Sequence, residues 1–193
     1  MSFRYSYVMV ALLAACEPAP TPDATVETPQ APPTPAAPTN LLTSDGWEGL
    51  RIGMTRAEVV ATLGEDANPN AAGGADPAQC DQFRPERAPD GMLVMLEQGK
   101  LTRISLSDPA QVETEGGLAV GDSASAVKSH FGDRAVTTPH KYSAAPAEYV
   151  TVWSGSAPPA PEARGIVYEV GDDGRVAHIH AGGPSIQYVE GCS

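Results

Sequence analysis

The sequence predicts an α+β fold: a tandem repeat in which short N-terminal helices are followed by an antiparallel sheet. Residues 49–67, GLRIGMTRAEVVATLGEDA, align without gaps to residues 117–135, GLAVGDSASAVKSHFGDRA, at an offset of 68. Residues 99–106, GKLTRISL, correspond to residues 174–181, GRVAHIHA, at an offset of 75. A self-match at a nearly constant spacing indicates two copies of one structural unit. We expect the first repeat over residues 41–110 and the second over residues 111–193.

The first fifteen residues are expected to be a signal peptide that is removed. Arg4 precedes an apolar run over residues 8–15, which is too short to span a bilayer, since a span needs roughly 20 residues. The run ends in Leu13-Ala14-Ala15-Cys16, which resembles the lipobox of bacterial lipoproteins. The resemblance implies that Cys16 is lipidated and becomes the mature N-terminus. The resemblance also implies that a lipid anchor holds the protein on a membrane of the cell envelope. We take this membrane to be the outer membrane, with the protein facing the periplasm.

Residues 16–40 are predicted to be a disordered linker behind the lipidated cysteine. Residues 17–40 contain eight prolines and no lysine or arginine, and they show no periodicity of 2 or 3.6. Such a segment cannot bury enough apolar surface to offset the entropy of ordering it. We expect an extended tether of about 70 Å when stretched at about 3.1 Å per residue.

Each repeat is predicted to open with one short helix of about nine residues. Thr55 and Ser123 stand at matching positions and suit helix N-caps, and Glu58 completes a capping box with Thr55. Gly64 and Gly132 stand where each helix would need a left-handed residue to end. The glycines of this stretch therefore serve the backbone and are not candidates for chemistry.

The helices are followed by hairpins. Residues 91–97 and 100–106 flank Gln98-Gly99, and residues 165–170 and 175–181 flank the Gly-Asp-Asp-Gly turn at 171–174. Earlier strands are expected at 80–83 and 148–153, and a last extended piece, SIQYVEG, at 185–191. In the strand at 148–153, Val150 and Val152 share the face expected to pack on the helices. Tyr149 and Trp153 share the other face and are our candidates for an exposed binding surface, because rigid aromatics make good anchors.

Two cysteines remain besides Cys16, namely Cys80 and Cys192. In an oxidising compartment such a pair is typically bridged, and two thiols without further ligands make a poor zinc site. A bridge between them would close a loop of about 113 residues and stabilise the fold by up to roughly 4–5 kcal/mol in the chain-entropy treatment.

Three polar positions deserve separate hypotheses. His178 and His180 alternate, so both should project from one face, where Asp172 or Asp173 could complete a Zn²⁺ or Cu²⁺ site. His178 corresponds to Arg103 of the first repeat, which indicates that both are ordinary polar residues on the surface. His178 and Arg103 are kept as candidate binding residues. We therefore predict no metal site. Ser123 follows Gly-Asp as in one esterase family, but its match to Thr55 favours a helix cap.

The stretch GMTRAEVVATLG, followed by LEQGKLTRI, resembles the SmpA/OmlA-type bacterial lipoproteins and the β-lactamase inhibitor proteins. It also resembles uncharacterised exported proteins that end in YVEGC. The resemblance covers residues 47–193 and implies a tandem unit of short helices and antiparallel sheet, as in the inhibitors, on a lipoprotein stem. It transfers architecture and leaves the partner open.

Function is predicted from what the chain has and lacks. A formal net charge of −12 opposes binding to nucleic acid. No phosphate loop, dinucleotide motif or metalloprotease helix is present, so we predict a protein that is no enzyme and has no cofactor. The leading hypothesis is a lipid-anchored envelope lipoprotein whose body binds another protein or an envelope component. The alternatives are a periplasmic inhibitor of a hydrolase (a lysozyme, protease or β-lactamase) and an esterase at Ser123.

Overall fold

The computed structural model describes residues 40–71 and 73–192. The predicted signal peptide, the lipidation at Cys16 and the proline-rich linker lie outside the described residues. Within the described part, no helix has the length and apolar character needed to cross a membrane.

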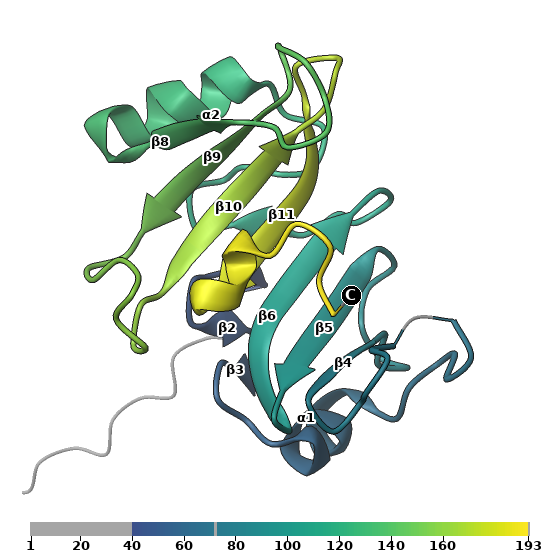
Figure 1. Cartoon of the computed structure of the whole chain (residues 1–193). Helices are drawn as coiled ribbons and strands as arrows, with labels where there is room; N and C mark the ends of the chain where they lie inside the picture. The colour runs from purple at the N-terminus through teal and green to yellow at the C-terminus, as the bar shows by residue number, and fades with distance from the viewer. Residues whose placement is uncertain (1–39, 72, 193) are drawn as a thin grey trace, which may run out of the picture. The chain divides into compact units, whose positions relative to one another are not determined.

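The described residues are organised around one seven-stranded antiparallel sheet (Figure 1). Its strands, in spatial order, are β4 (Cys80–Phe83), β5 (Met92–Glu97), β6 (Lys100–Ser107), β11 (Val176–Gly182), β10 (Gly165–Val170), β9 (Glu148–Trp153) and β8 (Val136–Pro139). Mostly antiparallel sheet with two short α-helices in the described residues agrees with the predicted α+β class. The predicted hairpins are confirmed as β5–β6 and β10–β11, whereas β8 was not predicted.

Both predicted helices form where their caps indicate. Helix α1 (Arg56–Leu63) begins after Thr55, whose hydroxyl accepts from the Glu58 backbone while the Glu58 carboxylate accepts from the Thr55 backbone. Helix α2 (Ala124–Phe131) begins after Ser123, whose hydroxyl accepts a hydrogen bond from a backbone N–H in the first turn. A 3₁₀ turn, η1 (Gly132–Arg134), follows α2. The capping-box prediction for Thr55 and Glu58 is therefore confirmed.

Four short strands were not predicted. β1 (Leu41–Leu42) pairs in parallel with β7 (Glu113–Thr114), and β2 (Gly46–Trp47) pairs with β3 (Leu50–Arg51). The β1–β7 pair joins the start of the described chain to the segment between β6 and α2. The sequence gives little signal for them because two-residue strands carry no readable alternation.

The core lies between the helices and one face of the sheet. Val59 of α1 and Val127 of α2 are fully buried against strand residues such as Ile104, Val150 and Tyr168. At about 25 cal/mol per Å² of apolar area, such contacts supply most of the stabilising free energy. The aliphatic residues Val150 and Val152 of β9 are both buried, as predicted.

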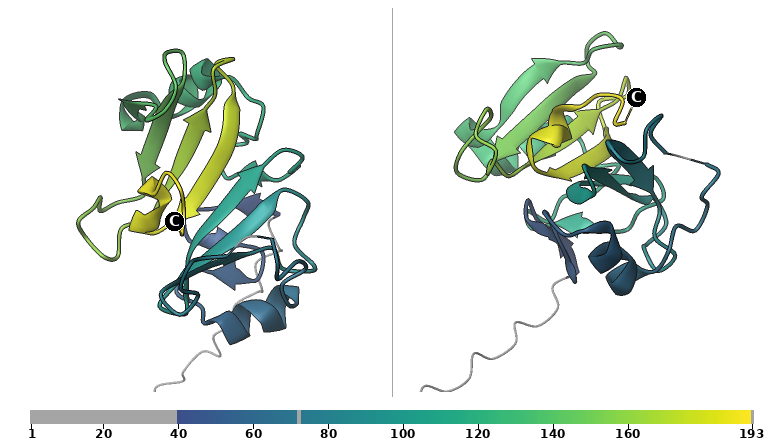
Figure 2. Two further views of the ribbon diagram at one scale, coloured as in Figure 1. Left: turned by 45° about the vertical axis from the view of Figure 1, so that its right-hand side comes forward. Right: turned by 60° about the horizontal axis from the view of Figure 1, so that its bottom comes forward.

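The opposite face of the sheet is crossed by the C-terminal segment, residues 183–192, which we call the strap. It starts with a 3₁₀ turn, η2 (Pro184–Gln187), and in Figures 1 and 2 it runs in yellow over the middle of the sheet toward β5 and β4. The prediction of an extended piece over 185–191 is therefore wrong. Pro184, at the start of η2, has its φ fixed at a value that suits a helical turn and lacks the N–H that a strand would use.

Candidate functional site

The face of the sheet beneath the strap, which we call the strap face, carries a row of polar side chains from four neighbouring strands. Thr138 of β8 is paired with Tyr149 of β9, Tyr149 with Glu169 of β10, and Glu169 with His178 of β11. Paired residues in antiparallel strands point to the same face with Cβ atoms about 5 Å apart. The register therefore assembles a polar cluster from residues far apart in the sequence.

Glu169 is the centre of this cluster. Its Oε1 lies 3.2 Å from Nε2 of His140, and its Oε2 lies 3.4 Å from Nε2 of His180. The side chain of Glu169 is 18% exposed, so the carboxylate is shielded but still reachable from solvent. Since a carboxylate only accepts, both imidazoles must donate through Nε2–H.

The loop after β8 fixes the proton position on His140. The backbone N–H groups of Tyr142 and Ser143 both donate to Nδ1 of His140, at 3.2 and 3.1 Å. A ring nitrogen that accepts two hydrogen bonds carries no proton, so the proton sits on Nε2, facing Glu169. The loop thus orients the His140 ring with its Nε2–H toward the carboxylate.

His180 reaches the same state by a different route. Burial lowers its pKa, the nearby positive charge of Arg103 lowers it further, and a hydrogen bond with Glu169 opposes both. A neutral ring that donates Nε2–H to Glu169 leaves Nδ1 as an acceptor, and the Ser105 hydroxyl lies 2.9 Å from it as the donor. Because its pKa is lowered, His180 is neutral near neutral pH and adds no positive charge beside Glu169.

The pKa of Glu169 reflects competing effects. Burial raises it, but hydrogen bonds from His180 and His140 and the charge of nearby His178 lower it from 4.5 to about 2. Stabilisation of an anion by two N–H donors outweighs the loss of hydration. The carboxylate is consequently ionised across the physiological pH range.

Tyr149 packs beside the acid. Its ring stacks on His140 with centroids 4.8 Å apart and 14° between the planes. Burial raises the pKa of Tyr149, and the negative charge of Glu169 raises it further. The backbone of Lys141 lowers it, although the contact between this backbone and the Tyr149 hydroxyl does not meet the geometry of a normal hydrogen bond. Tyr149 is thus a neutral aromatic wall next to a fixed negative charge.

Arg103 holds the strap on the sheet. Its Nη1 donates to the carbonyl oxygens of Tyr188 and Ser185, at 2.8 and 3.3 Å, and its Nη2 donates to Oε1 of Gln82, at 3.1 Å. The residue is only 4% exposed. A guanidinium with several donors in a fixed plane suits backbone carbonyls presented by a non-regular segment.

A second link between the strap and the sheet lies at the end of the strap. Cys80 and Cys192 are at disulfide distance, with Cα atoms 5.4 Å apart and a sequence separation of 112. Gly191 precedes this point with φ 66°, and a Cβ there would lie 2.4 Å from Oε1 of Gln82. The positive φ at this position favours glycine, while the Gln82 side chain could move to relieve the close approach.

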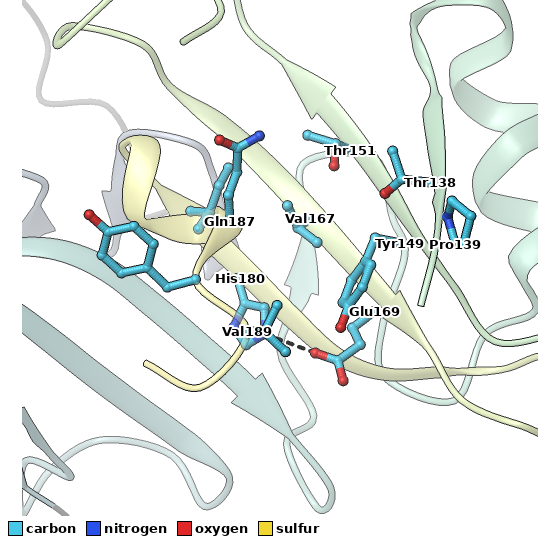
Figure 3. Close-up of a pocket in the computed structure, with 11 residues that line it drawn as sticks. Thr138, Pro139, Tyr149, Thr151, Val167, Glu169, His180, Gln187 and Val189 are labelled. Atoms are coloured by element: carbon cyan, nitrogen blue, oxygen red, sulfur yellow. Dashed lines mark hydrogen bonds and ion pairs between the residues drawn. The ribbon is translucent and has the colours of Figure 1, made fainter. Parts of the chain in front are cut away.

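Between the strap and the strap face lies a pocket of about 240 Å³ (Figure 3). Its floor and one side come from the sheet, its other side from the strap, and Glu169 and Tyr149 point toward each other at one end. The lining residues are Thr138, Pro139, Tyr149, Thr151, Val167, Glu169, His180, Ile186, Gln187, Tyr188 and Val189. A concave site with apolar walls and a few convergent polar groups is the form that ligand sites take.

The structure brings together some of the predicted binding residues and separates others. Tyr149 lines the pocket, and His178 is exposed in the polar row beside Glu169. Trp153 is half-buried on the same face, across Gly165, and does not line the pocket. The interpretation of Arg103 as a surface position is wrong, because the strap covers it.

The residues that sequence reasoning missed are Glu169 and His140. Neither stands in a motif, and 29 positions separate them. A signal for Glu169 exists in its strand, GIVYEV, since Glu169 is the one charged residue in an otherwise apolar run. His140 lies beyond an unpredicted edge strand and gives no such signal.

Two other sequence hypotheses find less support. His178 and His180 do share a face, with parallel rings 6.1 Å apart, but the described residues include no group of three or more His, Cys, Asp or Glu side chains placed to hold a metal ion. The Ser123 hydroxyl accepts from the Ala126 backbone at 3.2 Å and pairs with the Ser125 hydroxyl at 2.9 Å, as a cap does.

Comparison with protein-family models, with curated proteins and with solved structures finds no match to this chain.

Proposed function

We propose that this protein is a lipid-anchored lipoprotein of the cell envelope whose body binds another protein or an envelope component without catalysing a reaction. The lipobox-like Leu13-Ala14-Ala15-Cys16 supports the anchor, and the acidic, proline-rich linker supports a body that ranges away from the membrane. The observation that carries the binding role is the pocket between strap and sheet.

A duplicated body is part of the proposal, and backbone pairing supports it. The first cap residue, Thr55, forms an antiparallel bridge with Lys100, and the second cap residue, Ser123, forms one with Arg175. These pairs stand at the offsets of 68 and 75 residues that relate the two sequence copies. Each helix is therefore tied in the same way to the strand that follows its own hairpin turn, as expected of two copies of an SmpA/OmlA- or inhibitor-like unit.

The pocket favours binding because its parts are held rigidly. Hydrogen bonds from two histidines fix Glu169, and Arg103 together with the Cys80–Cys192 pair fixes the strap. A preorganised site loses less conformational entropy when a ligand binds. The hydroxyl of Ser123 serves as a helix cap, which supports a body without an esterase centre.

Photo-cross-linking in living cells tests the binding role. A cross-linking amino acid is placed at Trp153, which borders the strap face, and separately at Ala126, an exposed position on α2 on the other side of the sheet. The proposal expects a discrete cross-linked species from position 153 and none from position 126. Equal products from both positions, or none from either, would contradict it. The identity of the product separates an envelope component from a hydrolase, the runner-up partner.

Cell fractionation tests the anchor separately. The C16S variant should leave the membrane fraction, while the wild-type chain stays in it. A C16S protein that remains membrane-bound would rule out anchoring through Cys16.

A further inference from the structure

The charge of the pocket points to the sign of its ligand. Among the described residues that line it, Glu169 carries the one formal charge near neutral pH, because His180 is held neutral. Each oxygen of Glu169 accepts one imidazole N–H and retains a second lone pair. The carboxylate can therefore accept two more hydrogen bonds from a group that enters the pocket.

Arg103 attracts Glu169 through Coulomb interaction, but it does not reach into the pocket. Its guanidinium is engaged by Ser185, Tyr188 and Gln82, and it is absent from the pocket lining. The ion pairs of the described residues also leave Glu169 without an arginine or lysine partner, since the two side chains paired with it are histidines. A positive group from outside would find a partly shielded anion, where Coulomb attraction is stronger than in bulk water.

The rest of the lining suits an aliphatic stem that ends in a cation. Val167, Ile186 and Val189 provide apolar contact between sheet and strap. Tyr149 adds an aromatic ring beside the acid, and such rings attract cations through their π face. The Gln187 side chain adds an amide oxygen at the mouth. Ammonium and guanidinium groups on three- or four-carbon stems match this order of apolar and acidic surfaces.

We propose that the pocket between the strap and the sheet binds the side chain of a lysine or arginine, or a small alkylamine of the same chemistry, with its cation against Glu169 and its stem between Val167 and the strap. This inference deepens the proposed function, since it names the chemical group that the binding surface recognises. The strap then acts as the fixed second wall of a slot for one basic side chain.

Isothermal titration of the purified full-length chain tests the inference. The probes are Nα-acetyl-lysine amide, n-butylamine and, as the uncharged analogue, Nα-acetyl-norleucine amide. The two cations should bind about tenfold or more tightly than the norleucine compound. Tighter binding of the lysine amide than of butylamine identifies a peptide side chain as the source, and equal binding identifies a free amine. No binding of either cation, or equal binding of the norleucine compound, overturns the inference.

Two variants connect binding to the pocket. E169Q removes the charge with little change in shape and should weaken lysine-amide binding by about tenfold or more, while E113Q, which removes an exposed carboxylate on β7, should leave it unchanged. Unchanged binding in E169Q overturns the inference.

T138K covers the case in which E169Q does not fold. Thr138 is exposed on an edge strand and lines the pocket, so a lysine there is tolerated and competes with the probe. It should also weaken binding by about tenfold. Unchanged affinity in T138K overturns the inference. Failed titrations beside a successful cross-link at position 153 would refute the cation pocket and leave the proposed binding face standing.

Discussion

Nε2 of His180 lies 3.4 Å from Oε2 of Glu169, across the β10–β11 pairing. The contact joins a buried neutral imidazole to an ionised carboxylate, and it gives the strap face a permanent negative charge. The strap above it converts this polar patch into a pocket. The combination of a fixed charge and a fastened wall is the basis of the following predictions.

The Glu169 carboxylate should make stability depend on acid pH. Its pKa is about 2 in the folded protein and 4.5 in its ordinary state, so its contribution is fully present above about pH 4.5 and is lost as pH falls toward 2. The contribution is at most about 3 kcal/mol at neutral pH. Urea unfolding should show wild type exceeding E169Q by a margin that shrinks between these pH values. A margin that stays constant would contradict the account.

His180 should add a loss of stability at milder acidity. Because its folded pKa is lowered below 6.5, the unfolded chain binds a proton more readily, and stability present above pH 6.5 is lost as pH falls below it. The H180Q variant should lose less stability than wild type between pH 7 and pH 5. The H130Q variant serves as the control, since His130 lies exposed on α2, and it should behave as wild type.

Loss of the Cys80–Cys192 bridge should destabilise the body and open the pocket. A loop of this length corresponds to at most about 4–5 kcal/mol of unfolded-state entropy. C192S and the reduced wild-type protein should both melt at a lower temperature and bind lysine amide more weakly. The electrophoretic mobility of the C16S chain should still change on reduction, because Cys80 and Cys192 remain. A reducing agent without effect on melting would show that the two cysteines are not bridged.

Arg103 should be needed to keep the strap in place. Replacement by methionine keeps the apolar stem and removes three hydrogen bonds, to Ser185, Tyr188 and Gln82, which should cost about 2–4 kcal/mol of stability. Amide hydrogen exchange should rise in residues 185–188 of R103M. R175M removes an arginine that also donates to a backbone carbonyl, that of Gly121, and it is the matched control that should leave exchange in the strap as in wild type.

A buried hydroxyl pair should stabilise the core. Tyr168 donates to Oγ1 of Thr114 at 3.0 Å, and both side chains are fully buried. Y168F removes the donor and leaves Thr114 short of a partner, so thermal unfolding should show a loss of about 1–2 kcal/mol. Y142F removes an exposed hydroxyl and should cost less than half as much. A Y168F protein as stable as wild type would mean that the pair contributes nothing.

Local features of the fold were predictable from the sequence, because caps and hairpin turns depend on a few adjacent residues. Thr55 with Glu58 specified the start of α1, and Gln98-Gly99 specified the β5–β6 turn. The strap was not predictable, because its path depends on distant anchors, above all Arg103. The strap also explains why residues on both faces of β6 are buried.

The candidate site illustrates the same limit. Tyr149 could be placed on the correct face from alternation alone, since Val150 and Val152 had to face the helices. The meeting of Glu169, His140 and His180 depends on strand register and on a loop conformation, which no local pattern encodes. The one local indication of the site was Glu169, a charged residue inside an otherwise apolar strand.

The measurement that tests the central claim most directly is a nuclear magnetic resonance titration of the isotopically labelled full-length chain with Nα-acetyl-lysine amide. The account predicts that the shifted amide signals cluster at Tyr149, Glu169, His180 and Gln187, while those of α1 and α2 stay in place. Shifts centred on the helices, or no shifts at all at concentrations that saturate the titration in calorimetry, would contradict the claim that the strap and the sheet form the binding site.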